Sequence, residues 1–412
     1  MNKQAHANIM VGAFEALPQE FRATLELMKG LLPSVGNYPD LFDNPTVSDE
    51  EKSKIDSAWK RFCIFPKGMD ATNLHSWPHP IAEQAKSRPI SRHWLSQAIE
   101  ASRQGDREAF IKFIGCFSHW FGDLTQSAHI LDSQLLAELI PAPPTMSGFH
   151  YHTDLEAVTG ACGTLRQPHL LGLNVEEVSW RQAAINTEAM RECRRYIIPL
   201  LQAIFDGKKA EAELRAEPPV TKAAQLTLDI MYTALRLAAE DISPSERQAF
   251  ATVDLRLWKA DSEIHDLVYG GAILDGNRST PPAGAPVMAG KLLFPNGEKR
   301  AVPGLGVLPH SGMNGPRNCW MRYNLPVGVF SRFDAMIGMN AELTREGAAD
   351  FIVSIDGREV FRSGRRTVKD PATPISIKLD GANELTLKVE DVNDAKTFWN
   401  NHAYWGEPKL VK

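Results

Sequence analysis

Residues 106–129 read DREAFIKFIGCFSHWFGDLTQSAH, and this stretch decides the character of the first half of the chain. Its apolar residues recur at helical spacing, which predicts an amphipathic helix. His119 and Asp123 lie four residues apart at the end of that helix, and His129 follows six residues later. Four residues is slightly more than one helical turn, so the first two side chains project from the same face. Imidazole nitrogen and carboxylate oxygen are ligands that zinc prefers, so the spacing predicts a metal site.

A second stretch, FHYHTDLEAV at residues 149–158, contains two overlapping pairs with the same spacing. His150 with Asp154 and His152 with Glu156 both fit a histidine followed four residues later by an acid. The second pair leaves apolar residues behind the ligand face of the predicted helix, as a packed helix requires. We therefore favour His152 and Glu156 as ligands, and the first pair stays as the alternative.

The sequence on both sides of these stretches continues the helical pattern from Ala7 to about Glu240. We predict an all-α helical domain over residues 1–245. Proline is a helix-stop signal, so the run Pro141–Pro144 and the pair Pro218–Pro219 are expected to separate helices.

The composition and the apolar period of the sequence change after this domain. Residues 246–283 are rich in glycine and proline towards their end and are predicted to form a linker or irregular junction. From about residue 284 the apolar period becomes two, as in DFIVSIDGREVFRS, and the segments are separated by Asp-Gly and Gly-Ala turns. The predicted fold class is therefore a multi-domain α + β chain, in which an all-β sandwich at 284–412 follows the helical domain.

The histidine stretch HWFGDLTQSAH resembles the H-x-x-G-D-x-x-Q-P-x-H signature of the zinc-dependent phospholipase C family and its S1/P1 nuclease relatives, with Ser127 in place of the usual proline. HANIMVGAFEAL resembles the first-helix motif of that family and offers His6, and NYPDLFD resembles its Tyr-Pro-Asp element and offers Asp40. LHSWPHP resembles a short H-x-W element and offers His75, with His79 as the competing histidine. The order of these residue types is the family's order over about 240 residues.

The resemblance implies an all-α zinc phospholipase C-like domain that binds Zn2+, with three ions. It implies a first ion at Asp40, His75 and His119, a second at His6 and the chain's own N-terminus, with Asp123 bridging these two, and a third at His129, His152 and Glu156. Family members expose an N-terminal tryptophan whose amine binds zinc, whereas this chain begins with Met1. We hypothesise that the amine of Met1, or a water, completes the second ion's shell.

Phosphodiester hydrolysis needs a nucleophile at neutral pH and positive charge near the phosphoryl oxygens. Closely spaced zinc ions supply both. Asp40 is then the predicted catalytic residue, because it can bind metal and accept a proton from the attacking water.

The C-terminal segment from GVLPHSG to YWGEPKL resembles the NPCBM family, a galactose-binding-like sandwich named for carbohydrate binding. The motifs that carry this resemblance include FIVSIDGREVFRSG, LDGANELTLKVED and the terminal NHAYWGEPKL, in which Asn401 replaces the usual aspartate. Sugar binding needs aromatic faces, and Trp399, Tyr404 and Trp405 are the candidates for it. For Trp405 the competing interpretation is core packing at the end of a strand.

Composition limits the classes of partner. The formal net charge is −5 and the basic residues are scattered, so a stable complex with nucleic acid is disfavoured. The five cysteines contain no C-x-x-C pair and are predicted to be reduced thiols. No long apolar run predicts a membrane span, and the first residues lack the apolar core of a signal peptide. Both family resemblances nevertheless imply work outside the cell, with a cytoplasmic location as the alternative.

The function expected from these features is zinc-dependent phosphodiester hydrolysis of the phospholipase C type. The substrate would be a phospholipid at a membrane surface, and a glycan would be a second partner of the C-terminal domain. The acid at position 156 favours this reading. An S1/P1-like single-strand nuclease is the alternative if His150 and Asp154 are the ligands, and a non-catalytic glycan-binding protein is the second alternative.

Overall fold

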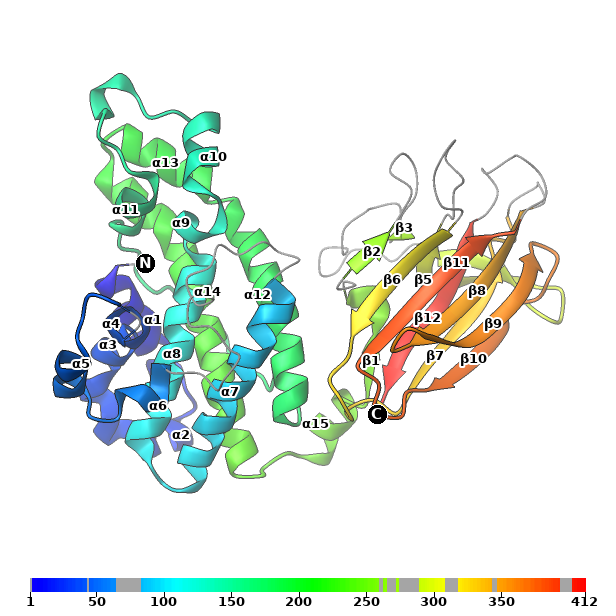
Figure 1. Ribbon diagram of the computed structural model, residues 1–412, viewed down its shortest axis with the longest axis horizontal. Helices are drawn as coiled ribbons and strands as arrows, with labels where there is room; N and C mark the ends of the chain where they lie inside the picture. Colours follow the sequence, from blue (N-terminus) through cyan, green and yellow to red (C-terminus); the bar gives the residue numbers. More distant parts are fainter. Residues whose placement is uncertain are drawn as a thin grey trace. The chain divides into compact units, whose positions relative to one another are not determined.

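The computed structural model describes residues 2–42, 44–63, 83–258, 262–264, 272–273, 289–307, 318–342, 347–392 and 402–412. The chain divides into two compact units, Met1–Ser243 and Pro244–Lys412. Helices make up the first unit and strands make up most of the second (Figure 1). The predicted order of an all-α part followed by an all-β part is therefore confirmed.

The helices of the first unit surround two long central ones. Figure 1 shows α8 and α14 near the middle of this unit, and α8 packs against α14, α7 and α1. The helices are α1 (Lys3–Glu15), α2 (Gln19–Leu25), η1 (Glu26–Leu31), α3 (Leu32–Val35), α4 (Tyr38–Phe42), α5 (Asp49–Ile55), α6 (Trp59–Cys63), α7 (Glu83–Arg103), α8 (Arg107–Thr125), α9 (Ser127–Ile130), α10 (Ser133–Leu139), η3 (Pro144–Met146), α11 (Tyr151–Glu156), α12 (Val175–Arg194), α13 (Ile197–Phe205) and α14 (Lys209–Ala238).

Helix α8 is the core of the unit because its phenylalanines recur at helical spacing. Phe110, Phe113, Phe117 and Phe121 are all buried. The helix begins at Asp106, whose side chain accepts a hydrogen bond from the backbone N–H of Ala109, as an N-cap residue should. A helix buried on this scale is a rigid base for the polar side chains that it carries near its C-terminal end.

The sequence-based stop at Pro218 and Pro219 is wrong. Both prolines lie inside α14, which runs without interruption from Lys209 to Ala238. Each proline removes a backbone donor and so weakens the helix locally. Burial of Ala216, Pro219 and Val220 on the face that packs into the unit compensates for that loss.

The second unit is a pair of antiparallel sheets. Among the described residues one sheet has the strand order β10-β7-β12-β5-β3, with β1 beside β12 and β4 beside β5, and the other has the order β2-β6-β11-β8-β9. The elements are α15 (Pro244–Ala249), β1 (Thr252–Asp254), η4 (Leu255–Leu257), β2 (Ser262–Ile264), β3 (Ala272–Ile273), β4 (Ala289–Leu293), β5 (Lys299–Val307), β6 (Asn318–Asn324), β7 (Arg332–Met339), β8 (Ala348–Ile355), β9 (Arg358–Thr367), β10 (Thr373–Lys378), β11 (Glu384–Asp391) and β12 (Ala403–Val411). Strands β1, β2 and β3 lie within the stretch 246–283 that the sequence predicts as a junction.

The Asp-Gly turns predicted from the sequence have the backbone conformation that such turns need. Asp356 and Gly357, between β8 and β9, both have positive φ, at 49° and 76°. Asp380 and Gly381 repeat this pattern before β11, at 40° and 80°. Between the paired strands β8 and β9, two consecutive residues with positive φ match the right-handed twist of the pair. Asp-Gly adopts this conformation at low cost in both turns.

In the part of the chain that the structure describes, no helix is long and apolar enough to cross a bilayer.

Candidate metal centre

Helix α8 presents His119 and Asp123 one turn apart. Both are buried, and the Nε2 atom of His119 lies 3.3 Å from the Oδ2 atom of Asp123. The other ring nitrogen of His119, Nδ1, donates a hydrogen bond of 2.9 Å to the backbone carbonyl of Gly36. Because a carbonyl oxygen can only accept, this contact leaves Nε2 directed at the carboxylate, as metal-binding histidines require.

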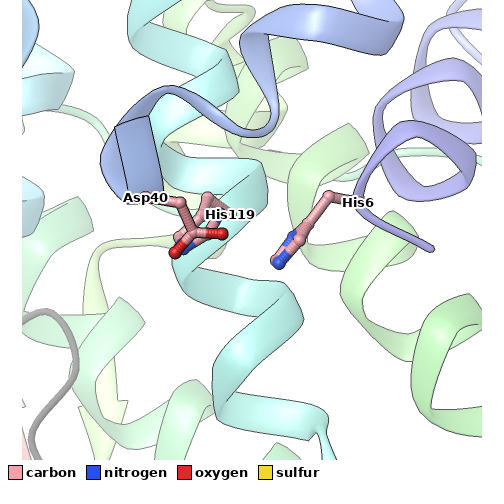
Figure 2. A group of neighbouring side chains, drawn as sticks. All are labelled: His6, Asp40 and His119. Atoms are coloured by element: carbon pink, nitrogen blue, oxygen red, sulfur yellow. The ribbon is translucent and has the colours of Figure 1, made fainter. Parts of the chain in front are cut away.

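Two further side chains reach the same point from helices α1 and α4. His6 Nε2 lies 3.5 Å from Asp123 Oδ1, and Asp40 Oδ1 lies 3.4 Å from His119 Nε2. The rings of His6 and His119 stack with their centroids 4.1 Å apart. Figure 2 shows His6, Asp40 and His119 coming from three separate helices and pointing toward one another, and their ligand atoms lie within 4.8 Å of one another. Residues more than 110 positions apart in the sequence therefore meet here.

A second group of ligand atoms lies beside the first. His129 from α9 and His152 and Glu156 from α11 have their ligand atoms within 4.8 Å of one another. His129 Nε2 is 3.7 Å from Asp123 Oδ1 and 2.7 Å from Glu156 Oε1, and His152 Nε2 is 3.4 Å from the same Glu156 oxygen. Asp123 therefore links the two groups.

The structure treats the two overlapping pairs on α11 differently. The Asp154 carboxylate accepts a hydrogen bond of 2.7 Å from the backbone N–H of His150, so it caps its own helix. Only His152 and Glu156 join a metal-type group among the described residues. This geometry favours the pair preferred from the sequence.

Three of the distances in the centre suit a shared ion better than a direct hydrogen bond. Two ligand atoms bound to one tetrahedral zinc at about 2.0–2.1 Å lie roughly 3.3–3.4 Å apart. The contacts of His119 with Asp123, His119 with Asp40, and His152 with Glu156 lie between 3.3 and 3.4 Å. His6 is fully buried, and neither of its ring nitrogens has a hydrogen-bond partner among the described residues. Buried polar atoms normally have partners, so these residues fit divalent metal ions.

The electrostatics of the centre favour ionised carboxylates. Burial opposes ionisation of Asp123, but the positive charge around it, that of His129 and His119 included, outweighs burial and holds the pKa of Asp123 well below its usual range. Burial also opposes ionisation of Glu156, but the hydrogen bond from His129 outweighs burial and lowers the pKa of Glu156 to about 2. Burial opposes charging of His119, but Asp123 and Asp40 prevail and raise its pKa to about 10. Burial, together with the neighbouring His119, lowers the pKa of His6 to about 4, so His6 is neutral at pH 7.

The rest of the histidine motif holds helices α8, α9 and α11 together. The Gln126 side chain is buried and donates a hydrogen bond of 3.3 Å to the backbone carbonyl of Leu155 on α11. Ser127 is the first residue of α9 and stands where the signature that this stretch resembles usually has proline. The first helical position favours proline because its N–H would be unpaired there, so serine can occupy it without changing the path of the chain.

Two asparagines attach helix α1 to the segment after α11. Asn2 Nδ2 donates to the Ala157 carbonyl at 3.0 Å and to Thr159 Oγ1 at 2.8 Å, and Asn8 Nδ2 donates to the Gly160 carbonyl at 3.0 Å. These tethers connect the helix that carries His6 to the segment that follows Glu156. Sequence reasoning missed them because nothing local marks a contact across more than 150 residues. The Gln126 tether, in contrast, could have been suspected from its place in the motif.

Helix α4, which carries Asp40, has a buried anchor of its own. The Tyr38 hydroxyl donates a hydrogen bond of 3.2 Å to Asp56 Oδ2, and Lys112 Nζ on α8 lies 2.6 Å from the same oxygen. The side chains of Lys112 and Asp56 are only 10% and 5% exposed. This ion pair ties α4 to the helix that presents His119.

Several predicted site residues lie outside the described part of the chain. They are Met1, His75, His79 and Trp399.

The aromatic candidates for sugar binding that the structure describes occupy different environments. Trp405 is fully buried, with its indole 5.2 Å from the Phe351 ring and 6.3 Å from the Phe333 ring between centroids. A sugar needs an accessible aromatic face, so the burial of Trp405 favours the core-packing interpretation over sugar binding. Tyr404 is half-buried and packs beside Leu292 and Val302.

Comparison with protein families identifies part of the second unit. Residues 297–411 match the NPCBM/NEW2 domain. The chain therefore contains an NPCBM domain, and the match lies inside the predicted 284–412 span. Comparison with curated protein sequences finds no match.

Solved structures similar to this chain fall into two groups. The CBM51 module of a Clostridium perfringens GH95 protein, in complex with methyl-galactose, is 22% identical over 39% of this chain and 99% of its own length, with a TM-score of 0.32. The alpha-toxin of an avian Clostridium perfringens strain is 11% identical over 97% of this chain and 85% of its own, with a TM-score of 0.34. The alpha toxin of Clostridium absonum is 9% identical over 100% and 99%, with a TM-score of 0.36. At these low scores the likenesses carry no conclusion about activity.

Proposed function

We propose that the chain is a zinc-dependent phosphodiester hydrolase of the phospholipase C type, whose C-terminal domain binds carbohydrate. The observation that carries the proposal is the gathering of imidazoles and carboxylates from five helices into two adjacent groups that Asp123 links. His6, His119 and His129 all place Nε2 within 3.3–3.7 Å of that buried carboxylate. A structural core has no need for three imidazoles around one acid.

The side chains divide into the three sets that the family resemblance implies. Asp40 and His119 would hold a first zinc and His6 a second, with Asp123 bridging them, and His129, His152 and Glu156 would hold a third. His75 completes the first set in this proposal. Bound zinc would supply positive charge for the phosphoryl oxygens and acidify water.

The protein itself contributes orientation and a proton acceptor. The Asp40 side chain is 46% exposed, and His152 and Glu156 are 40% and 26% exposed, whereas His6 and His119 are almost inaccessible. These exposed ligands define the side from which a phosphodiester reaches the centre. Burial opposes ionisation of Asp40, but the His119 hydrogen bond and charge lower its pKa, so the carboxylate is ionised at neutral pH, which is the form that a proton acceptor needs.

Glu156 is the observation that favours phospholipid over single-stranded nucleic acid as substrate. The nuclease alternative depends on His150 and Asp154, and the carboxylate of Asp154 is engaged in capping α11. The net charge of −5 adds no attraction for a polyanion.

Hydrolysis of phosphatidylcholine vesicles and of single-stranded DNA, with and without chelator, tests the proposal. We expect zinc in the purified protein and chelator-sensitive release of phosphocholine. Glu156→Gln should lower turnover by roughly 100-fold through loss of a ligand charge. Asp154→Asn keeps an oxygen to cap the helix and is the matched control, with turnover within about twofold of wild type. Cleavage of DNA alone would establish the nuclease alternative, and a zinc-replete protein that cleaves neither substrate would overturn the enzymatic proposal.

Carbohydrate binding by the NPCBM domain is the second half of the proposal. The similar CBM51 module was solved with methyl-galactose, which makes galactosides the first probe. Such a domain would hold the hydrolase near a glycan-bearing surface and raise its local concentration there. Calorimetric titration of methyl-galactose into the full chain, with Tyr404→Ala as the variant, tests it. No heat of binding for galactosides or for a wider glycan panel would refute it.

A further inference from the structure

Gly122 lies on α8 between the two ligands of the metal motif, and the ring of His6 packs directly over it. A Cβ atom at position 122 would lie 2.8 Å from both Cε1 and Nδ1 of His6, and 3.2 Å from Cδ1 of Ile9. Carbon atoms in proteins essentially never approach at 2.8 Å, since such contacts fall well inside the optimal separation of about 3.5–4.0 Å. Any side chain at this position therefore forces His6 to move.

The His6 ring has no free space to move into. It is fully buried and stacks on His119 at 4.1 Å with an interplanar angle of 17°. The backbone carbonyl of His6 is also close to Gly36, the residue that follows α3. A Cβ atom at Gly36 would lie 3.1 Å from the oxygen of that carbonyl. A ring displaced from Gly122 must therefore leave its position beside Asp123.

Helix α1 as a whole is also held against withdrawal. The hydrogen bonds of Asn2 to Ala157 and Thr159, and of Asn8 to Gly160, lie on either side of His6 along the helix. Moving α1 away from α8 by the fraction of an ångström that a methyl group needs would stretch these bonds. The clash is therefore concentrated on the imidazole.

We propose that Gly122 is a positioning residue that holds His6 against Asp123, because only a hydrogen atom at this position leaves room for the ring. Glycine is otherwise a poor choice here, since alanine is the better helix former in a helix interior. A Gly122→Ala substitution that destabilises the protein therefore acts mainly through the contact with His6, since the Ile9 methyl at 3.2 Å is the far end of a flexible side chain. The link from this position to zinc rests on the proposed function, whereas the steric role does not.

The test is a double-mutant cycle on metal-free full-length protein, with melting temperature as the readout. Gly122→Ala should lower the melting temperature by about 5 °C, as overpacking in a domain of this size does. In a His6→Ala background the clash is gone, so the same substitution should leave the melting temperature unchanged or raise it by about 2 °C. Gly30→Ala, where a Cβ meets nothing within 4 Å, is the matched control and should not lower it.

Zinc content gives a second readout. Gly122→Ala should bind one zinc fewer per chain than wild type, and Gly30→Ala should bind the full number. An equal loss of melting temperature in both His6 backgrounds would overturn the proposal, and so would a Gly122→Ala protein that melts and binds zinc like wild type. If wild type itself binds no zinc, the proposed function fails, while the cycle of melting temperatures still decides the role of Gly122.

Discussion

Replacing Lys112 by methionine is predicted to lower the free energy of unfolding more than replacing an exposed lysine by methionine would. Lys112 Nζ lies 2.6 Å from Asp56 Oδ2, and both side chains are at most 10% exposed. Methionine keeps most of the side-chain volume of lysine and removes only the charge. The substitution would leave the Asp56 carboxylate buried, with the Tyr38 hydroxyl and the backbone N–H of Ala58 as its donors.

The magnitude follows from the cost of an uncompensated buried charge. Removing one member of a buried ion pair costs about 3–5 kcal/mol. The second contact of Lys112, with Glu108, adds little because Glu108 is 57% exposed. We take the lower end, about 3 kcal/mol, since the Tyr38 hydrogen bond remains; this corresponds to a fall of roughly 6–12 °C in melting temperature.

The pH range of this effect follows from the direction of the pKa shift. Burial would lower the pKa of Lys112, but Asp56 and Glu108 outweigh it and raise that pKa. A raised pKa on a base means that the stabilisation is fully present below the unfolded value of about 10.4 and is lost as the pH rises through the folded value. Measurements at pH 7 therefore report the whole effect.

Urea unfolding of the full chain, followed by circular dichroism in the helical band, measures the free energy. Lys54→Met is the matched control, because Lys54 pairs with Glu50 in a contact where both side chains are more than two-thirds exposed. Its cost should stay below about 0.5 kcal/mol. If Lys112→Met unfolds within about 0.5 kcal/mol of wild type, the buried ion pair does not anchor α4 and the reasoning is refuted.

Three further predictions concern other parts of the chain. The pKa of Glu156 is lowered to about 2, because the His129 hydrogen bond outweighs burial. The contribution of Glu156 to the stability of the metal-free protein is therefore present above pH 4.5 and lost as the pH falls toward 2. The stabilities of wild type and Glu156→Gln in acid unfolding should converge in that range, and a constant difference between them would contradict the assignment. Burial raises the pKa of Cys193 and of Cys319 to about 12. Neither thiol should therefore react with iodoacetamide at pH 8 until the protein unfolds. Rapid labelling of the native protein, measured by mass spectrometry, would show that these thiols are not buried. Trp405→Ala should destabilise the sandwich by about 3–5 kcal/mol, measured by the change in its unfolding midpoint, and a loss of sugar binding without loss of stability would restore Trp405 as a ligand residue.

Local spacing in the sequence was sufficient to indicate the two halves of the fold and the character of the candidate site. A period near 3.6 predicts helices and a period of two predicts strands, and both hold because each depends only on neighbours along the chain. His119 with Asp123 and the two overlapping pairs within residues 150–156 could be singled out for the same reason, since a separation of four residues places two side chains on one helical face. The apolar residues behind the ligand face then favoured His152 with Glu156. The Asp-Gly turns at 356–357 and 380–381 likewise express a local backbone preference.

Tertiary packing decided what local spacing leaves open. Pro218 and Pro219 read as stop signals, but burial of their helix keeps α14 continuous. For Trp405 the sequence left sugar binding and core packing open, and its burial between Phe333 and Phe351 favours core packing. Nothing near Gly122 in the sequence reveals that the His6 ring covers it, because the two residues belong to helices more than a hundred positions apart. The residue types and their local spacing come from the sequence, whereas their convergence depends on which helix faces pack together, and that is a property of the whole folded chain.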